Sequence, residues 1–252
     1  MAKQSGILPI QGTLGNITFF KTKDGYMVKE KSTVSASKIA NDPAFARTRE
    51  NMAEFGRAGK ASKVLRTVLR SIMQGSTDGR IVSRLTKQMI DVIKMDETSP
   101  RGLRNVIDGE ATLLEGFECN INGKLSTTLL APYTPGINRV SGEVSVEIPA
   151  FIPAKMLAAP EGATHFKIRT AAALIDFEKA SGESVEADSG YLPFNNLPTV
   201  LLTLAMQLTP ASTHPIFLVI SVEFVQEVNA VKYPLQNGAY NACTVVKVDG
   251  GN

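Results

Sequence analysis

The apolar residues of this chain change their spacing near Gly116, and that change constrains the fold more than any other feature. Before it they recur at steps of three and four residues, which is typical of helices that bury one face. After it they alternate with polar residues, as in strands with one buried face. The pattern predicts an α+β protein with two domains, residues 1–116 and residues 117–252.

The clearest local element is a β-hairpin over residues 16–31. Two β-prone runs flank Asp24-Gly25, and Asp-Gly supplies the positive φ values that a two-residue turn needs. Apolar side chains then project from both faces, and an isolated hairpin is marginal in water. We therefore expect it to pack against its own helices or against another copy of the chain. The upstream arm, ILPIQGTLG, has too few contacts to order itself, so it either frays or is held by a partner.

The arm and the hairpin together are the predicted self-association segment. Its candidate residues are Ile7, Leu8, Ile10, Leu14, Ile17, Phe19, Phe20, Tyr26, Met27 and Val28.

Two helices are expected next, over residues 43–74 and 80–94, forming a helical hairpin. Asp42 can cap the first, and Pro43 suits its first position. Its predicted buried stripe is Phe45, Met52, Phe55, Gly59, Ser62, Leu65, Leu69 and Ile72. Gly56 and Gly59 each cost about 1 kcal/mol relative to alanine inside a helix. We therefore expect another backbone, from the hairpin or the second helix, to pack closely there.

The opposite side of the first helix is basic. Its ladder consists of Arg57, Lys60, Lys63, Arg66 and Arg70. Residues 1–118 carry 19 Lys+Arg and 13 Asp+Glu, whereas residues 119–252 carry 8 and 11. The ladder could contact phosphates at successive turns, but no aromatic residues interleave with it to stack bases. A solvated face, or pairing with carboxylates of another subunit, is the simpler interpretation.

The remaining chain predicts an antiparallel, immunoglobulin-like β-sandwich. The expected strands lie near residues 117–121, 124–131, 144–151, 164–177, 198–208, 216–228 and 240–248, separated by glycine, proline and asparagine. The stretch GESVEADSG is interpreted as a solvated turn. Tyr133, Tyr191 and Phe194 are the aromatic residues that its loops could offer to a ligand.

Little in the composition supports catalysis. The chain has two histidines and no tryptophan. The segment AEFGRAGKAS is similar to a phosphate-binding loop in its glycines and lysine, but it lies within the apolar stripe of a predicted helix and not between a strand and a helix. Cys119 and Cys243 make no disulfide framework, which fits a reducing compartment. We expect no enzyme activity, catalytic residue, cofactor, metal site or small-molecule substrate. Without a bilayer-spanning run or a secretory signal pattern, we expect no membrane partner and a cytoplasmic location, or a particle assembled there.

The first 75 residues resemble an uncharacterised family of Bacteroidota proteins classed as a domain of unknown function. The resemblance rests on GILPIQGTLGNITFFKTKDGYMVKEK followed by NDPAFARTRENMAEFGRAGKASKVLRTVLRSI. The matching positions are Gly6, Gly12, Gly15, Pro43, Arg49 and Phe55. The resemblance implies a glycine-rich hairpin, a helix that starts at Asp-Pro or Asn-Pro, a following β-sandwich, and a modular structural or assembly role. It implies no catalytic residues.

Three functions are compatible with the sequence. The first is a structural protein that self-associates through its arm and hairpin into a homo-oligomer, a filament or a phage-like particle. The second is a cytoplasmic protein that binds nucleic acid without sequence specificity through residues 43–73. The third is a β-sandwich that binds a ligand such as a sugar or peptide.

Overall fold

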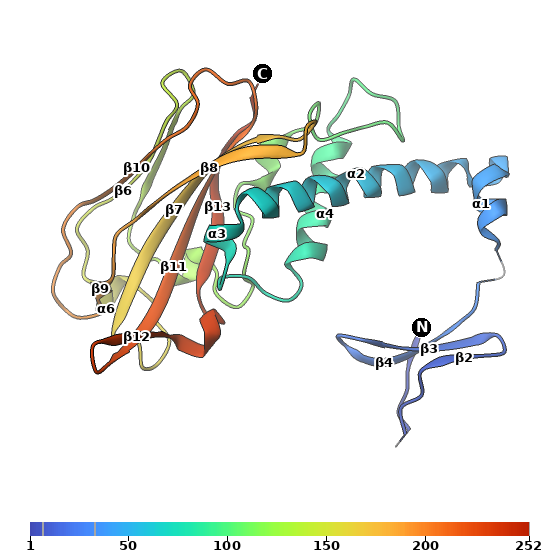
Figure 1. Cartoon of the computed structure of the whole chain (residues 1–252), viewed down its shortest axis with the longest axis horizontal. Helices are drawn as coiled ribbons and strands as arrows, with labels where there is room; N and C mark the ends of the chain where they lie inside the picture. The colour runs from blue at the N-terminus through green and yellow to red at the C-terminus, as the bar shows by residue number, and fades with distance from the viewer. Residues whose placement is uncertain (7, 33, 252) are drawn as a thin grey trace. The chain divides into compact units, whose positions relative to one another are not determined.

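The computed structural model describes residues 1–6, 8–32 and 34–251, which separate into two compact units, Met1–Asn51 and Met52–Asn252 (Figure 1). We expected a boundary after residue 116. The helices instead share a hydrophobic core with the strands that follow them, so the chain divides within the first long helix.

The first unit contains a four-stranded antiparallel sheet of order β1-β4-β3-β2. Its elements are β1 (Ala2–Lys3), β2 (Gly12–Leu14), β3 (Ile17–Thr22), β4 (Gly25–Glu30), the short helix α1 (Ala36–Asn41) and the 3₁₀ turn η1 (Pro43–Phe45). The predicted hairpin is confirmed as β3 and β4. The arm was expected to lack order of its own, but part of it forms β2, and the residues before the arm form β1. Both strands flank the hairpin because each can pair its backbone with a hairpin strand.

The hairpin turn lies one residue earlier than predicted. Thr22 pairs with Gly25, so the two turn residues are Lys23 and Asp24. Gly25 still supplies a positive φ, of 112°, but as the first residue of β4. The shift changes neither strand's alternation, so apolar side chains still project from both faces, with Phe19, Tyr26 and Val28 on one and Phe20 and Met27 on the other.

The second unit holds most of the chain. Its helical elements are α2 (Ala46–Val68, which begins in the first unit), α3 (Arg70–Met73), α4 (Ile81–Lys94), η2 (Ala111–Leu114), α5 (Leu125–Thr128), α6 (Pro153–Met156) and η3 (Leu235–Gly238). Its strands are β5 (Thr134–Asn138), β6 (Glu143–Ile148), β7 (His165–Asp176), β8 (Ser181–Asp188), β9 (Leu192–Pro193), β10 (Leu202–Gln207), β11 (Ile216–Val228), β12 (Val231–Pro234) and β13 (Ala242–Asp249).

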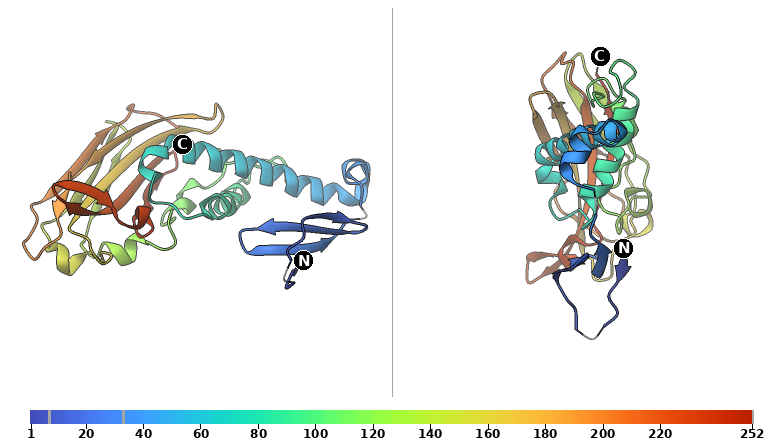
Figure 2. Two further views of the ribbon diagram at one scale, coloured as in Figure 1. Left: turned by 60° about the horizontal axis from the view of Figure 1, so that its bottom comes forward. Right: turned by 90° about the vertical axis from the view of Figure 1, so that its right-hand side faces the viewer.

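A six-stranded sheet forms the middle layer of this unit. Its order is β12-β11-β7-β8, with β13 on β11 and β9 on β7. One face packs against the helices, where Ala171 and Phe217 share a core with Leu65 of α2. The other face packs against the small sheet β10-β6-β5, where Leu174 joins Val146. Figures 1 and 2 show the helices and the small sheet on opposite sides of β7 and β11.

This burial on both faces explains the uninterrupted apolar runs in β7 and β11. A strand covered on one side only would alternate with polar residues, whereas a strand covered on both sides has no wet face. The helices and antiparallel sheets confirm the α+β class.

Three strand predictions need correction. Residues 124–131, expected as a strand, contain the short helix α5. Residues 117–121 contribute only the isolated bridge from Glu118 to Thr244. The stretch GESVEADSG is not a solvated turn but most of β8, which pairs with β7 over Ser181–Asp188. Its many polar residues suit an edge strand whose residues alternate between exposed and half-buried.

Candidate functional site

The sheet of the first unit has two chemically different faces, which its pairing register defines. Residues directly opposite each other in an antiparallel sheet share a face. The face that we call the apolar face carries Ala2, Gly12, Leu14, Ile17, Phe19, Lys21, Tyr26, Val28 and Glu30. The other, the basic face, carries Lys3, Thr13, Thr18, Phe20, Thr22, Met27 and Lys29.

No described residue of the first unit is buried within that unit. Leu14 at the edge of the apolar face keeps 76% of its surface exposed, and Ile17, Leu8 and Ile10 are also exposed. The remaining predicted association residues, Phe19, Phe20, Tyr26, Met27 and Val28, are half-buried. Ile7 lies outside the described residues. The structure therefore brings the other predicted residues into one small sheet and its adjoining loop.

Lysine side chains shield part of the aromatic surface. The Nζ of Lys21 lies 5.4 Å from the centroid of the Tyr26 ring on the apolar face. The Nζ of Lys29 lies 5.5 Å from the centroid of the Phe20 ring on the basic face. Such cation–π contacts are weak at exposed sites, about 0.5 to 1 kcal/mol each.

Gln4 holds the loop between β1 and β2. Its Nε2 donates to the carbonyls of Ile10 and Met27, each at 3.1 Å, and its Oε1 accepts from the backbone N–H of Ile10 at 3.0 Å. These bonds tie the backbone of Ile10 to β4, although the Ile10 side chain is exposed. Nothing in the residue pattern indicated this role for a single glutamine.

The close packing that was predicted between α4 and Gly56 or Gly59 is not found within the second unit. A Cβ added at either position would meet no other atom within 4 Å, so the second helix, α4, does not approach them. Met52 and Phe55, expected in the buried stripe, are 61% and 59% exposed. Ser62, Leu65, Leu69 and Ile72 of the predicted stripe are buried as expected, and the buried side of α2 also carries Glu54, Ala58, Ala61 and Val64. An approach by another copy of the chain stays a prediction.

The first half of α2 departs from the predicted stripe, and a carboxylate that the sequence pattern ignored faces inward there. Glu54 accepts hydrogen bonds from the backbone N–H of Gly102 at 2.8 Å and from Arg104 Nε at 2.9 Å. These bonds satisfy the charge of a side chain that is almost fully buried. Hydrophobic spacing alone could not reveal it, because its partners lie about 50 residues away.

The basic ladder is smaller than predicted. Arg57 donates through Nη1 to the carbonyls of Gly102 at 2.6 Å and Arg104 at 3.3 Å, so it fastens a loop rather than facing solvent. Arg66 is half-buried, whereas Lys60, Lys63 and Arg70 are exposed. The structure therefore leaves three of the five predicted cations fully available along α2 and α3.

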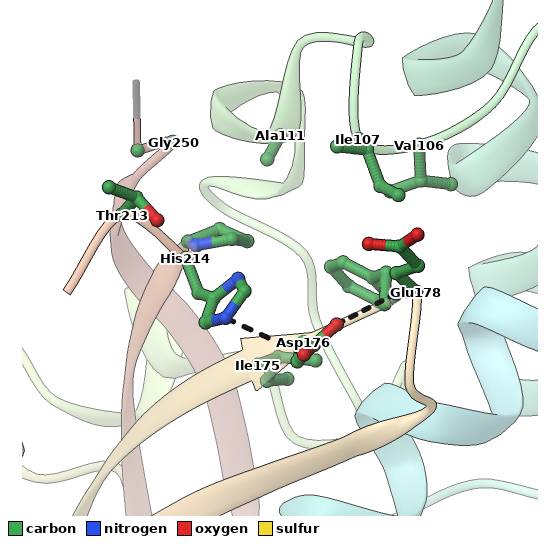
Figure 3. Close-up of a pocket in the computed structure, with 12 residues that line it drawn as sticks. Val106, Ile107, Ala111, Ile175, Asp176, Glu178, Thr213, His214 and Gly250 are labelled. Atoms are coloured by element: carbon green, nitrogen blue, oxygen red, sulfur yellow. Dashed lines mark hydrogen bonds and ion pairs between the residues drawn. The ribbon is translucent and has the colours of Figure 1, made fainter.

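A small cavity of about 210 Å³ lies where β7, the loop before β11 and the end of β13 meet. His214 Nε2 lies 3.5 Å from Asp176 Oδ2, and the two side chains face each other in Figure 3. Asp176 Oδ1 accepts from the backbone N–H groups of Glu178 and Lys179. The Lys179 N–H in particular lowers the pKa of Asp176. These hydrogen bonds hold the turn between β7 and β8, so the pair formed by His214 and Asp176 has a structural role.

The three loop aromatics proposed for a ligand do not form one site. Tyr133 and Phe194 pack against the core between the two sheets. Tyr191 lies apart from them, with Lys167 Nζ 4.9 Å and Lys232 Nζ 5.6 Å from its ring centroid. Among the described residues, no three His, Cys, Asp or Glu side chains are grouped so as to hold a metal ion.

Two findings bear on the protein's surroundings and relatives. Within the described parts of the chain, every helix is too short or too polar to cross a bilayer. The resemblance to the Bacteroidota family stays an expectation from the sequence. Comparison with family models, with curated proteins and with solved structures gives no match to this chain.

Proposed function

We propose that this chain is a non-enzymatic structural protein that assembles with copies of itself through the apolar face of its N-terminal sheet. One observation carries the proposal. The first unit presents apolar side chains on a four-stranded sheet, yet none of its described residues is buried. A sheet of this size gains stability in water mainly by covering such a face.

The face, rather than the edges, is the better association surface. The edge strands β1 and β2 contain only two and three residues, so each offers few backbone groups for pairing with another strand. The apolar face, in contrast, extends over all four strands through Ala2, Val28, Phe19 and Leu14. Two such faces packed together would form a small sandwich.

Homo-oligomers, filaments and phage-like particles are the assemblies that this surface could support. The second unit, with two large cores of its own, would be displayed by the assembly. We also propose that the two packed sheets of the second unit form an immunoglobulin-like sandwich. We propose the cytoplasm as the place of assembly.

Deleting residues 1–31 tests the proposal. We expect the full chain to be oligomeric at micromolar concentration and the shortened chain to be monomeric, as measured by light scattering. The second unit should stay folded, with an unchanged cooperative thermal transition, because both cores lie outside the deleted segment. A full-length chain that remains a monodisperse monomer would refute the assembly role.

A matched pair of point variants locates the surface. Val28→Lys places a charge in the apolar face, and Thr13→Lys adds the same charge to the basic face of an edge strand. We expect the first to reduce assembly at least tenfold more than the second, because burying an unpaired ammonium is costly. If the sheet docks on its own chain instead, Val28→Lys lowers thermal stability without changing particle size.

Nucleic acid binding is the second candidate, favoured by the exposed Lys60, Lys63 and Arg70. We expect any binding to fall steeply with salt and to be similar for unrelated sequences, since counterion release depends on phosphates alone. Changing these three residues to glutamine should then abolish binding in a filter or polarisation assay. Arg57→Gln serves as the contrast, because that side chain is engaged with a loop. Binding that persists in the triple variant would contradict this role.

A further inference from the structure

The fold brings together two cysteines that lie far apart in the sequence. Glu118 and Thr244 form an antiparallel bridge, and the backbone N–H of Cys119 donates to the carbonyl of Cys243 at 2.7 Å. The same register continues on the other side, where the N–H of Val245 donates to the carbonyl of Phe117 at 3.1 Å. Cys119 therefore lies directly opposite Cys243, with both side chains on one face of the sheet.

That face belongs to the core shared with the helices. Both cysteines are free, fully buried members of this core. A hydrogen bond between the two side chains, together with burial, raises the pKa of the Cys243 thiol well above its usual value. The Cys243 thiol is thus protonated and unreactive while the fold stays closed.

The geometry of opposed residues suits a covalent bond. Directly opposite residues in antiparallel strands have Cα atoms about 4.5 to 5.5 Å apart. Disulfides span Cα separations of roughly 4.4 to 6.8 Å, with a mode near 5.5 to 6 Å. Cys119 and Cys243 can therefore be joined without moving the strands apart.

We propose that Cys119 and Cys243 are a disulfide-forming pair, oxidised when the chain folds or opens in the presence of a small disulfide oxidant. The thiolate of one cysteine attacks the oxidant and releases one thiol, giving a mixed disulfide. The second cysteine thiolate then displaces the other half of the oxidant. Two protein thiols lose two protons and two electrons, and one oxidant disulfide becomes two thiols.

The bond would join two parts of the second unit. Cys119 lies in the segment after α4 and η2, and its carbonyl accepts from the backbone N–H of Asp78 and from Arg84 Nη2. Cys243 lies in β13, which pairs with β11 along the sheet. A cross-link there would close a loop running from residue 119 to residue 243, and long closed loops restrict the unfolded chain most.

Refolding the full chain with oxidised glutathione tests the proposal. The measurements are the free thiols titrated in denaturant and the intact mass. We expect the thiols to fall from two per chain to none, with a loss of about 2 Da and no glutathione adduct. The melting temperature should rise by about 10 °C relative to the reduced chain. Two persistent thiols, stable glutathione adducts or disulfide-linked dimers in place of the intramolecular bond would overturn the proposal.

A second measurement keeps the test decisive if refolding is inefficient. The native chain is incubated with the same oxidant in increasing urea below the unfolding transition. We expect the rate of thiol loss to rise at least tenfold with urea, because the closed core excludes the oxidant. Cys119→Ala should yield one glutathione adduct per chain under those conditions, since the second thiol that resolves the mixed disulfide is absent. A wild-type chain that accumulates two stable glutathione adducts under those conditions, as two independently reacting thiols would, contradicts the pairing.

Discussion

Replacing Asp96 with alanine is expected to lower the free energy of unfolding by about 2 to 4 kcal/mol. Asp96 follows α4 and is 3% exposed. Its Oδ1 accepts from the backbone N–H groups of Thr98 and Ser99, both at 2.9 Å, and its Oδ2 accepts from that of Asn105 at 3.0 Å. Alanine would leave these donors without their acceptor in a loop that the carboxylate organises, and urea unfolding measures the loss.

The pH dependence of stability provides a second measurement. Burial alone would raise the pKa of the Asp96 carboxyl, but hydrogen bonds from Ser99, Asn105 and Thr98 outweigh it and hold the pKa well below its usual 3.8. A depressed pKa in the folded state stabilises the fold above the unfolded-state pKa and loses that contribution as the pH falls below it. We expect the wild-type chain to lose more stability than Asp96→Ala between pH 5 and pH 2, roughly the range of an unfolded aspartate.

Asp96→Asn separates charge from shape. Asparagine is nearly isosteric with aspartate but has one acceptor oxygen in place of two. Its amide group would face a backbone donor, so most of the destabilisation should remain. Near-wild-type stability in both variants would show that the loop does not depend on this carboxylate.

Local signals predicted the local elements well. The hairpin over residues 16–31 and the helices over 43–74 and 80–94 follow from turn chemistry, capping and hydrophobic spacing within short windows. The error at the hairpin turn is one residue, because Gly25 can supply a positive φ either within a turn or at the start of a strand.

Features that depend on distant partners were not predictable in the same way. The inward position of Glu54 on α2 depends on the hydrogen bond that Arg104 donates to it, and the polar strand β8 depends on pairing with β7. The same distinction between local signals and distant partners applies to the apolar face of the N-terminal sheet. The hairpin around Asp24-Gly25 predicted two strands whose apolar residues project from both faces, whereas the strands β1 and β2 that extend the apolar face arise from pairing across the sheet.

Gly238→Ala is expected to lower the free energy of unfolding by about 2 to 4 kcal/mol, through backbone strain and a clash. Gly238 has a φ of +79°, which side chains with a Cβ rarely adopt. A Cβ there would lie 2.0 Å from the carbonyl oxygen of Gly75, in the turn between α3 and α4. The same oxygen accepts from Asn241 Nδ2 at 3.1 Å, so the turn cannot withdraw without losing that bond.

Alanine variants of two further glycines separate the cost of backbone strain from the cost of the clash. Gly75 has nearly the same φ, +78°, but an added Cβ would meet nothing within 4 Å, so Gly75→Ala should cost only the strain, about 1 to 2 kcal/mol. Gly59 lies in a regular helix with open space around it, so Gly59→Ala should stabilise the chain by about 0.5 to 1 kcal/mol. Urea unfolding should rank the variants in that order, and equal losses at Gly238 and Gly75 would disprove the clash. If Gly59→Ala stabilises the protomer but weakens assembly, the contact that the sequence suggested at this glycine lies between copies of the chain.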